Sequence, residues 1–314
     1  MQRLLLLGLV GLAAQIVDGA LGMGYGVTST SLLLLVGLSP ALASASVHLA
    51  EMGTNIASGL SHWRLGNVDW KLVWKLGVPG AVGAFAGATF LSNLATDWAK
   101  PVMAHILGGL GLYILFRFAF RAPKVAEARV SPHRARFLVP LGLAGGFVDA
   151  TGGGGWGPVS TTSLLSAGRT APRTVIGSVD TSEFMVSTAA SIGFLLALGA
   201  AGIDFGIVAA LLIGGVIAAP IAAWLVSRIP ARIMGVAVGG LIVLTNVNTV
   251  FVAGNITGVQ AVIGVAVVLA LWIGLVIWTT VQHRAQARRE AAESAAEPAS
   301  EDPVAEDPVS EVTR

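Results

Sequence analysis

Residues 147 to 165 read FVDATGGGGWGPVSTTSLL, which places an aspartate, four consecutive glycines and a run of hydroxyl side chains in apolar surroundings. The chain around this stretch has the composition of a membrane protein: 54% of its 314 residues are hydrophobic and 11% are charged, against about 25% charged in soluble domains. In lipid, backbone without helical hydrogen bonds is tolerated only where protein buries it or where it lines a wet cavity. The stretch therefore predicts a break inside a membrane helix.

Apolar runs near the length of about 20 residues that crosses a bilayer recur along the chain. Among them are 72 to 94, 205 to 227, 232 to 252 and 259 to 280. This pattern indicates an all-α polytopic membrane protein and leaves no stretch for a separate soluble domain. The formal net charge of +2 comes from scattered loop and tail residues, so we expect no nucleic-acid partner. There is no cysteine, which excludes disulfides, thiolate metal sites and cysteine catalysis, and we expect neither a metal nor a cofactor.

The N-terminus, MQRLLLLGLVGLAAQ, has the arginine, leucine-rich core and small residues of a signal peptide. The same pattern returns in mid-chain as FLVPLGLAGGFVDATGG, where no signal can act. We therefore expect a retained helix.

An internal repeat contains the glycine-rich stretch. A shift of 131 residues aligns GLAAQIVDGALGMGYGVTSTS (11 to 31) with GLAGGFVDATGGGGWGPVSTT (142 to 162). The pairs that result, the last three after a slip of one residue, are Asp18 with Asp149, Gly24 with Gly155, Tyr25 with Trp156, Gly26 with Gly157, Ser31 with Ser163, Pro40 with Pro172 and Glu51 with Glu183. Two halves of one ancestral unit are the simplest interpretation, and such duplication is the usual plan of secondary transporters.

The basic loops set the orientation, because short loops rich in Lys and Arg lie in the cytoplasm. The richest is RFAFRAPKVAEARVSPHRAR, 117 to 136, which we place inside, and counting spans from it also places GRTAPR, 168 to 173, inside. The segment 137 to 167 then starts and ends on the cytoplasmic side, as a re-entrant pair of half-helices broken at the glycines. By the same argument the homologous segment 3 to 37 enters and leaves from outside.

The two halves are accordingly expected to be inverted repeats, each a glycine-broken re-entrant helical hairpin followed by three transmembrane helices. If each hairpin is instead one long broken crossing, the repeats become parallel and the chain has eight spans. The run AAESAAEPASEDPVAEDPVSE near the C-terminus is acidic and low in complexity, which predicts disorder. The expected units are a first repeat over 1–120, a basic cytoplasmic linker over 121–136, a second repeat over 137–282 and a disordered cytoplasmic tail over 283–314.

Two breaks at matching positions point to a central site between the repeats. Glycine exposes amide groups without hindrance, and the half-helix after each break presents free N–H groups and the positive end of a dipole, which suits an anion. The hydroxyls there can cap the helix, pack against neighbouring helices or donate to a bound oxyanion. The candidate substrate-binding residues are Gly24, Gly26, Thr28, Ser29, Thr30, Ser31, Asn55, Gly154, Gly155, Trp156, Gly157, Ser160, Thr161, Thr162 and Ser163.

Acidic side chains at membrane depth are expensive and suggest ion or proton pathways, although an acid beside a break can also be a structural cap. Asp180 and Glu183 are three residues apart on one helical face and can share a proton. His48 lies one turn before Glu51, where it can relay protons or make an ordinary polar contact. The candidate proton-coupling residues are Asp18, His48, Glu51, Asp149, Asp180 and Glu183.

The duplicated unit, GLAAQIVDGALGMGYG and GLAGGFVDATGGGGWGP followed by small-residue spans, resembles the sulfite exporter TauE/SafE family of bacterial membrane transporters over roughly residues 1 to 280. The resemblance implies transport of small sulfur-containing anions, such as sulfite or organosulfonates, across the cytoplasmic membrane. The second repeat has GGGGWGP for GMGYG and Asp180 where His48 stands. The halves are therefore not expected to serve the substrate equally.

The leading hypothesis is a secondary transporter, and not an enzyme, that moves a small anion with protons by alternating access in the bacterial cytoplasmic (inner) membrane, with a cytoplasmic C-terminus. Its partners would be the anion, the lipid bilayer and, in a homo-oligomer, a second copy of the chain. One alternative is an anion channel. The other is an intramembrane enzyme in which Asp18 and Asp149 form a shared-proton dyad. Flexible breaks followed by hydroxyl runs suit a binding site better than a rigid dyad.

Overall fold

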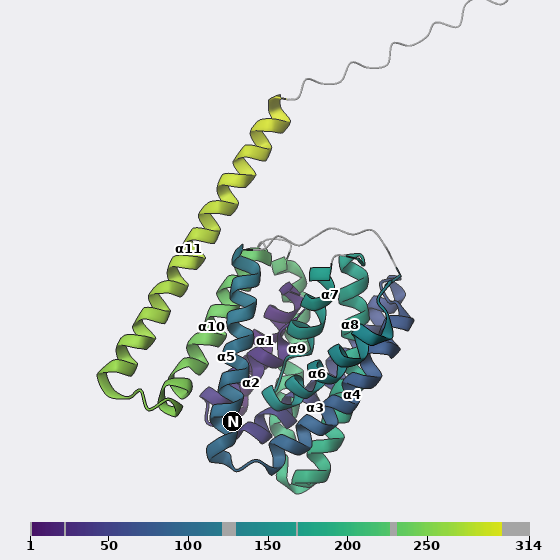
Figure 1. Ribbon diagram of the computed structural model, residues 1–314, viewed down its shortest axis with the longest axis vertical. Helices are drawn as coiled ribbons and strands as arrows, with labels where there is room; N and C mark the ends of the chain where they lie inside the picture. The colour runs from purple at the N-terminus through teal and green to yellow at the C-terminus, as the bar shows by residue number, and fades with distance from the viewer. Residues whose placement is uncertain (1, 22, 121–129, 168, 227–230, 297–314) are drawn as a thin grey trace, which may run out of the picture.

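The computed structural model describes residues 2–21, 23–120, 130–167, 169–226 and 231–296, and over these residues its regular secondary structure is helical. The elements are α1 Gln2–Leu21, α2 Tyr25–Leu35, α3 Pro40–Arg64, α4 Trp70–Asn93, α5 Thr96–Phe120, α6 Ala135–Gly152, the π-helix η1 Gly157–Thr161, α7 Thr162–Ala167, α8 Pro172–Leu198, the 3-10 helix η2 Ala200–Gly202, α9 Phe205–Val226, α10 Ala231–Ala253 and α11 Gly258–Ala296. Helices α1 to α10 form one bundle, and α11 lies against α10 and extends away from it (Figure 1).

Several helices have the character of membrane spans, as the composition predicted. Those long and apolar enough to cross a membrane are Thr96–Phe120, Pro172–Leu198, Arg232–Ala253 and Gly258–Arg289. The shorter apolar helical segments are Leu4–Asp18, Tyr25–Leu35 and Phe205–Ala218. The chain is therefore a multi-pass, all-helical membrane protein over the part that the structure describes.

Local sequence signals explain where the long helices begin. The matched prolines of the repeat, Pro40 and Pro172, are the first residues of α3 and α8. Proline suits this position because its fixed φ matches the helix and its missing N–H would have no helical partner there. Asp69 caps α4 by accepting hydrogen bonds from the N–H groups of Lys71 at 3.0 Å and Leu72 at 3.4 Å.

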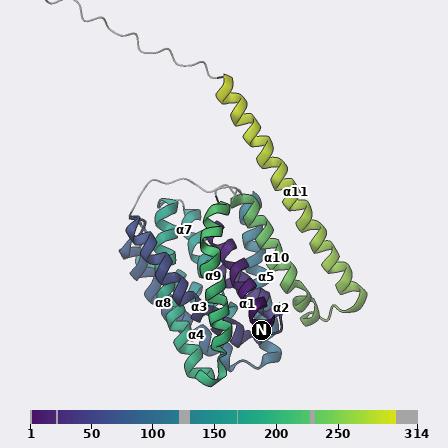
Figure 2. The ribbon, with the colours of Figure 1, turned by 180° about the vertical axis from the view of Figure 1, so that it is seen from behind.

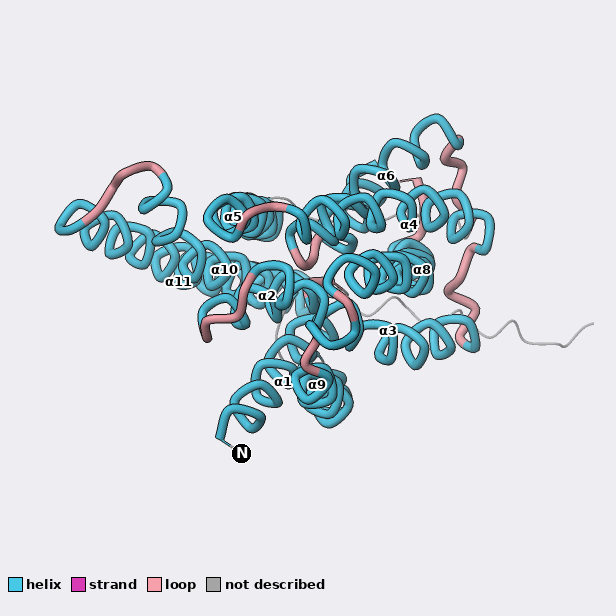
Figure 3. Tube along the Cα trace, turned by 90° about the horizontal axis from the view of Figure 1, so that it is seen from below, coloured by secondary structure: helices cyan, strands magenta, loops and turns pink. Residues whose placement is uncertain are grey.

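Two helix pairs pack through glycine: α6 lies against α4, and α1 lies against α9 (Figures 2 and 3). A Cβ added at Gly146 on α6 would overlap the backbone of Gly80 on α4. A Cβ added at Gly214 on α9 would likewise overlap the backbone of Gly8 on α1. Membrane helices reach this separation only where the facing residues are small.

Helices α6 and α8 both run alongside α4 in the direction of α4. The contacts that establish this are Gly142 with Leu76 and Gly87 with Thr151 for α6, and Gly77 with Ser182 and Gly193 with Ala88 for α8. Both helices therefore start at the end of the bundle where α4 starts. The chain between them turns back on itself near the middle of the bundle.

The broken segments lie in the main apolar core. One buried cluster contains Met23 and Val27 from the first break and Trp156 from the second, together with Leu76 of α4 and Phe194 of α8. Both halves of the chain contribute to this cluster, so the two breaks are held within one packed body.

The end of α11 differs from the expectation of a disordered tail beginning at residue 283. The helix continues to Ala296. Residues 283 to 296 read HRAQARREAAESAA, and Ala, Arg, Gln and Glu are strong helix formers, which outweighs the low complexity of this segment. Residues 297–314, and residues 121–129 of the expected linker, lie outside the described part of the chain.

Candidate functional site

Both breaks have an aspartate that caps the half-helix after the glycines. Asp18 Oδ1 accepts the backbone N–H of Tyr25 at 3.3 Å, and Asp149 Oδ1 accepts that of Trp156 at 2.9 Å. In each case the donor lies seven residues after the aspartate. An anionic cap interacts favourably with the positive end of a helix dipole. The two repeats thus share a local geometry as well as a sequence pattern.

Glycine is required at the breaks because the backbone there is left-handed. Gly24, the residue before α2, has a φ of 112°. Gly153 and Gly154, between α6 and η1, have φ values of 69° and 148°. Residues other than glycine rarely adopt such φ angles, so these glycines set the positions of the breaks.

The two breaks meet at the centre of the bundle. A Cβ added at Gly26 would lie 2.7 Å from Gly154 Cα and 3.1 Å from the carbonyl oxygen of Gly153. The hydroxyl of Thr30, on α2, donates a hydrogen bond to that same carbonyl. We call the point where Gly26, Gly153 and Gly154 meet the junction. The structure therefore brings together glycines from both predicted binding segments.

Glu51 of α3 reaches the junction. A Cβ added at Gly26 would lie 2.9 Å from Glu51 Oε1. The side chain is 2% exposed, and its Oε2 is buried without a hydrogen-bond partner among the described residues. A buried, unsatisfied carboxyl oxygen is costly unless it is protonated or bound to something else. Glu51 is therefore the acid best placed to respond to a ligand at the junction.

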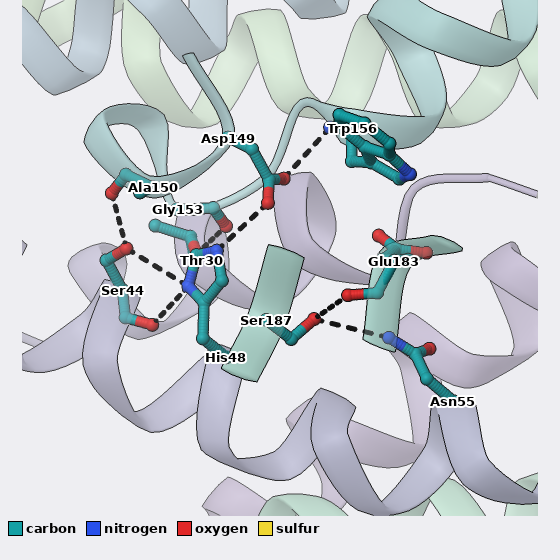
Figure 4. Close-up of polar contacts among 10 residues, drawn as sticks. All are labelled: Thr30, Ser44, His48, Asn55, Asp149, Ala150, Gly153, Trp156, Glu183 and Ser187. Atoms are coloured by element: carbon teal, nitrogen blue, oxygen red, sulfur yellow. Dashed lines mark hydrogen bonds and ion pairs between the residues drawn. The ribbon is translucent and has the colours of Figure 1, made fainter. Parts of the chain in front are cut away.

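Asp149 also binds His48, from the first half of the chain (Figure 4). The distance between Asp149 Oδ2 and His48 Nε2 is 3.1 Å, and both side chains are buried. His48 Nδ1 lies 2.8 Å from the backbone carbonyl oxygen of Ser44, which can only accept, so Nδ1 carries a hydrogen. A second hydrogen then lies between Nε2 and Oδ2. The pair has no net charge whichever atom holds that hydrogen.

A further hydrogen bond joins the first half of the chain to the second break. The hydroxyl of Ser44 donates to the carbonyl oxygen of Ala150 at 2.7 Å. Together with the His48 contact and the Thr30 bond, it fixes the end of α6 to α2 and α3. The sequence indicated that His48 and Asp149 were functional candidates, but it did not predict that they pair.

The other predicted acids lie along the contact between α3 and α8. Asp180 Oδ2 accepts a hydrogen bond from the Ser58 hydroxyl at 2.7 Å and lies 4.0 Å from His62 Nε2. The backbone carbonyl of Glu183 accepts from Ser187 at 2.9 Å, and Ser187 accepts from Asn55 at 3.2 Å (Figure 4).

Asn55 also lines a cavity of about 570 Å³. This cavity lies between α3, α4 and α8, and its walls are mostly apolar and aromatic. Asn55 is therefore beside the junction rather than in it.

The hydroxyl runs divide into two groups. In the first group the hydroxyls have protein partners: Ser29 donates to the Tyr25 carbonyl, Ser31 accepts from Asn246, and Thr162 accepts from Tyr113. In the second group are Thr28 and Ser160, whose hydroxyl oxygens are buried without a partner among the described residues.

Thr28 and Ser160 match in the repeat when the one-residue slip that pairs Ser31 with Ser163 is applied, since 28 plus 132 is 160. Buried hydroxyls without partners are uncommon and suggest a missing ligand or water. They are therefore the strongest binding candidates of the two runs.

The remaining predicted residues have more ordinary surroundings. A Cβ added at Gly155 would lie 3.1 to 3.4 Å from atoms of Val148 and Asp149. A Cβ added at Gly157 would lie 2.8 Å from Met23. Thr161 is buried, and Ser163 is partly exposed. Trp156 is fully buried and donates from Nε1 to the carbonyl oxygen of Val179 at 3.1 Å, which anchors the second break to α8.

Two partners of the hydroxyl runs were missed from the sequence. Tyr113 on α5 donates to Thr162 at 2.8 Å, and Asn246 on α10 donates to Ser31 at 3.0 Å. Their signal in the sequence is weak, because each is one of several polar residues in a largely apolar span. No group of three or more His, Cys, Asp or Glu residues within the described segments could hold a metal ion.

The fold and the junction define a polytopic membrane protein with discontinuous helices that meet at mid-bundle, an arrangement found in secondary transporters. The family model "Sulfite exporter TauE/SafE" matches residues 7–249, and the chain belongs to that family, as its repeat predicted.

Named relatives agree with this assignment. The chain is 49% identical to the "Probable membrane transporter protein YtnM" of Bacillus subtilis (strain 168) over 281 residues, which covers 88% of this chain and 93% of the relative. It is 28% identical over 147 residues to the "Probable membrane transporter protein YdhB" of the same strain, 47% of this chain and 59% of the relative. A "Probable membrane transporter protein" of Haemophilus influenzae is 24% identical over 159 residues, 50% of this chain and 60% of the relative.

No solved structure matches the chain. The family and the relatives together indicate a membrane transporter of the TauE/SafE type.

Proposed function

We propose that the chain is a secondary transporter that moves a small sulfur-containing oxyanion, of the sulfite or organosulfonate type, across the cytoplasmic membrane together with protons. The observation that carries the proposal is the junction, where glycines of two broken helices meet beside the buried carboxyl of Glu51. The substrate class follows from the name of the family.

We infer that the two halves are inverted copies of one unit. The contacts between them support this, because they occur in reciprocal pairs. His48 faces Phe194 with ring centroids 6.1 Å apart, and His62 faces Asp180 at 4.0 Å; adding 132 to 48 and 62 gives 180 and 194. Reciprocity of this kind is what a two-fold axis between two copies produces.

The course of the chain supports the inverted arrangement. Helices α6 and α8 start at the same end of the bundle, which fits a re-entrant hairpin between them. In Figure 1, α7 lies at the end of the bundle opposite the N-terminus of α1. The two hairpins would then enter from opposite sides, and alternating access would follow from movement of one copy against the other.

The substrate oxyanion would bind at the junction, between the hydroxyls of Thr28 and Ser160. Both hydroxyls are buried and lack a partner among the described residues, so each can donate a hydrogen bond to a ligand without breaking another of these. An anion here would lie beside Glu51. Two negative charges repel strongly in a buried site, so binding would favour protonation of Glu51 and thereby couple the anion to a proton.

The enzyme alternative is not favoured by the contacts of the two aspartates. A shared-proton dyad needs the two carboxyls against each other. Asp149 is instead bonded to Trp156 and His48, and Asp18 is bonded to Tyr25. A channel remains distinguishable by experiment, because it cannot accumulate substrate against a gradient.

The test is uptake of labelled sulfite, thiosulfate, sulfate and an organosulfonate into proteoliposomes, with and without an imposed pH gradient. We expect at least one sulfur oxyanion to accumulate above equilibrium when a pH gradient is present. Movement that only equilibrates the anion would indicate a channel, and no movement of any anion under any gradient would end the proposal.

The variants for this assay are Glu51→Gln and Glu183→Gln. Asp97→Asn serves as the matched control, because Asp97 is an exposed acid in the first turn of α5. We expect pH-driven uptake to be lost in Glu51→Gln and kept in Asp97→Asn. If both glutamate variants accumulate substrate like the wild type, the proposed proton carriers are wrong.

A further inference from the structure

A second cavity, of about 500 Å³, lies at the base of the second broken segment and is separate from the junction. The start of α6 and the connection from α7 to α8 form its walls. Three arginines line it, Arg134, Arg136 and Arg169, together with His133, and Phe137 contributes apolar surface. The chain thus places four basic side chains around one hollow where the segment enters and leaves the bundle.

The charges around this cavity are not balanced by the described residues. Among the described residues, no acidic side chain lines it. Over the described segments, none of the three guanidinium groups has an ion-pair or hydrogen-bond partner. The tendency of basic residues to lie in cytoplasmic loops accounts for arginines at this end of the bundle. It does not account for three of them around one cavity, where like charges repel.

His133 provides a second, independent observation. Its Nε2 is buried and has no partner among the described residues. Burial lowers the pKa of His133, and the nearby charge of Arg169 lowers it further. The lowered pKa favours the neutral imidazole beside the arginines, and its buried Nε2 is a polar atom for which the described residues supply no partner.

The cavity wall is held in place by the rest of the protein. The backbone N–H of Ser131 donates to Asp69 Oδ2 at 2.8 Å, and Asp69 is the cap of α4. The ring of His133 packs against Phe137 with centroids 5.2 Å apart. A site with an anchored wall is preorganised, so less ordering is needed when a ligand binds.

We propose that this cavity binds an oxyanion group, namely a sulfite, sulfonate or phosphate. Guanidinium groups bind such groups through paired, charge-assisted hydrogen bonds, and their planar fork matches the geometry of the oxyanion. The group can come from a dissolved anion, which guanidinium groups bind directly, or from the headgroup of an anionic phospholipid, which basic pockets of membrane proteins bind. The site is independent of the junction and does not require that the junction binds substrate.

The first arm of the test measures binding of dissolved anions. The full-length protein is placed in phosphatidylcholine nanodiscs and titrated with sulfite, sulfate and phosphate by calorimetry. We expect Arg136→Gln and Arg169→Gln to weaken binding about tenfold or more, because each removes a charge-assisted hydrogen bond. Arg173→Gln is the matched control: Arg173, at the start of α8, is exposed like the cavity arginines but does not line the cavity.

The second arm tests whether the bound oxyanion group belongs to a lipid headgroup. Thermal unfolding is compared in nanodiscs of phosphatidylcholine and of phosphatidylglycerol. If phosphatidylglycerol stabilises the wild type and the Arg173→Gln variant but not Arg136→Gln or Arg169→Gln, the ligand is a lipid headgroup. Thermal unfolding in phosphatidylcholine also reports whether each variant is folded.

The pH dependence provides a third check. A bound anion opposes the effect of Arg169 and favours protonated His133, so affinity should rise as the pH falls through the pKa of His133. His133→Gln should remove this dependence. The proposal is overturned if neither arm separates the cavity variants from Arg173→Gln. Binding that persists unchanged in all the variants would belong to the junction instead, so failure here leaves the proposed transport function standing.

Discussion

The two breaks are built alike but are held differently. In the first, Asp18 caps α2 through one hydrogen bond of 3.3 Å to Tyr25. In the second, Asp149 caps η1 at 2.9 Å and also binds His48, while Ser44 and Thr30 bind the backbone beside it. The second break is thus fastened to the first half of the chain by three side chains. The first break is held to the second half of the chain by fewer side chains: Tyr25 donates to the carbonyl oxygen of Leu211, and Asn246 donates to Ser31.

This difference indicates separate roles for the buried acids. Asp149 is hydrogen-bonded to His48 and Trp156, so the loss of either bond would destabilise the second break. Glu51 lies at the junction with one oxygen unsatisfied, so its protonation can change with the ligand at little structural cost. We therefore expect the acids at the second break to be structural and the acid at the junction to couple transport to protons.

The largest expected effect comes from Gly154→Ala. Gly154 has a φ of 148°, and an added Cβ would overlap the backbone of Gly26 and Val27. Backbone strain and overpacking together should lower the free energy of unfolding by more than about 3 kcal/mol and separate the two breaks. Thermal unfolding of the purified protein measures the change.

The control for this variant is Gly37→Ala. Gly37 also has a positive φ, 92°, but an added Cβ would meet nothing within 4 Å. Only the backbone strain applies, so the free energy of unfolding should fall by about 1 to 2 kcal/mol. Equal losses in the two variants would show that the breaks do not meet as described.

Asp149→Asn should have the next largest effect. It leaves His48 buried without a carboxyl partner, which should cost about 3 kcal/mol of the free energy of unfolding. Asp18→Asn keeps an acceptor for the Tyr25 N–H and should cost at most about 1 kcal/mol. Chemical denaturation of both variants measures the difference in their free energies of unfolding. A larger loss of stability in Asp18→Asn than in Asp149→Asn would contradict the claim that the second break is held more firmly.

Thr30→Val and Thr28→Val test the hydroxyl runs. Thr30→Val removes the donor to the buried carbonyl of Gly153, which should cost about 1 to 2 kcal/mol in stability. Thr28→Val removes a hydroxyl that has no partner among the described residues, so stability should change by less than about 0.5 kcal/mol while substrate uptake falls. A Thr28→Val protein with normal uptake would remove Thr28 from the proposed site.

Among the variants that remove a hydrogen bond between the two halves, Tyr25→Phe should have the smallest effect on stability. The Tyr25 hydroxyl donates to the carbonyl oxygen of Leu211 on α9 at 3.2 Å. Loss of this single neutral hydrogen bond should cost about 1 kcal/mol or less. Trp156→Phe, which removes the bond to Val179 and much buried surface, is the matched change at the second break and should cost more on thermal unfolding.

Much of this architecture was predictable because it depends on local chemistry. Left-handed backbone favours glycine, so GMGYG and GGGGWGP indicated where the helices break. Proline suits the first position of a helix, so the matched pair Pro40 and Pro172 carried a local signal for the starts of α3 and α8, although we used it only to define the repeat. The two aspartates were candidates because acids at membrane depth suggest proton pathways. Their alternative role, a cap beside the break, is the one that their hydrogen bonds show.

The contacts across the two halves were not predictable in this way. His48 and Asp149 are 101 residues apart, and only the packing of α3 against α6 brings them together. The same applies to Asn246 and Ser31 and to Tyr113 and Thr162. The end of α11 was misjudged because low complexity was given more weight than the helix propensity of its residues.

The most direct test of the central claim compares two modes of transport in Glu51→Gln. Labelled sulfite is measured in proteoliposomes, first as accumulation driven by a pH gradient and then as exchange against unlabelled sulfite without a gradient. If Glu51 carries the coupled proton at the junction, the variant will lose accumulation and keep exchange. If accumulation and exchange both match the wild type, Glu51 is not the coupling acid and the account of the junction is contradicted.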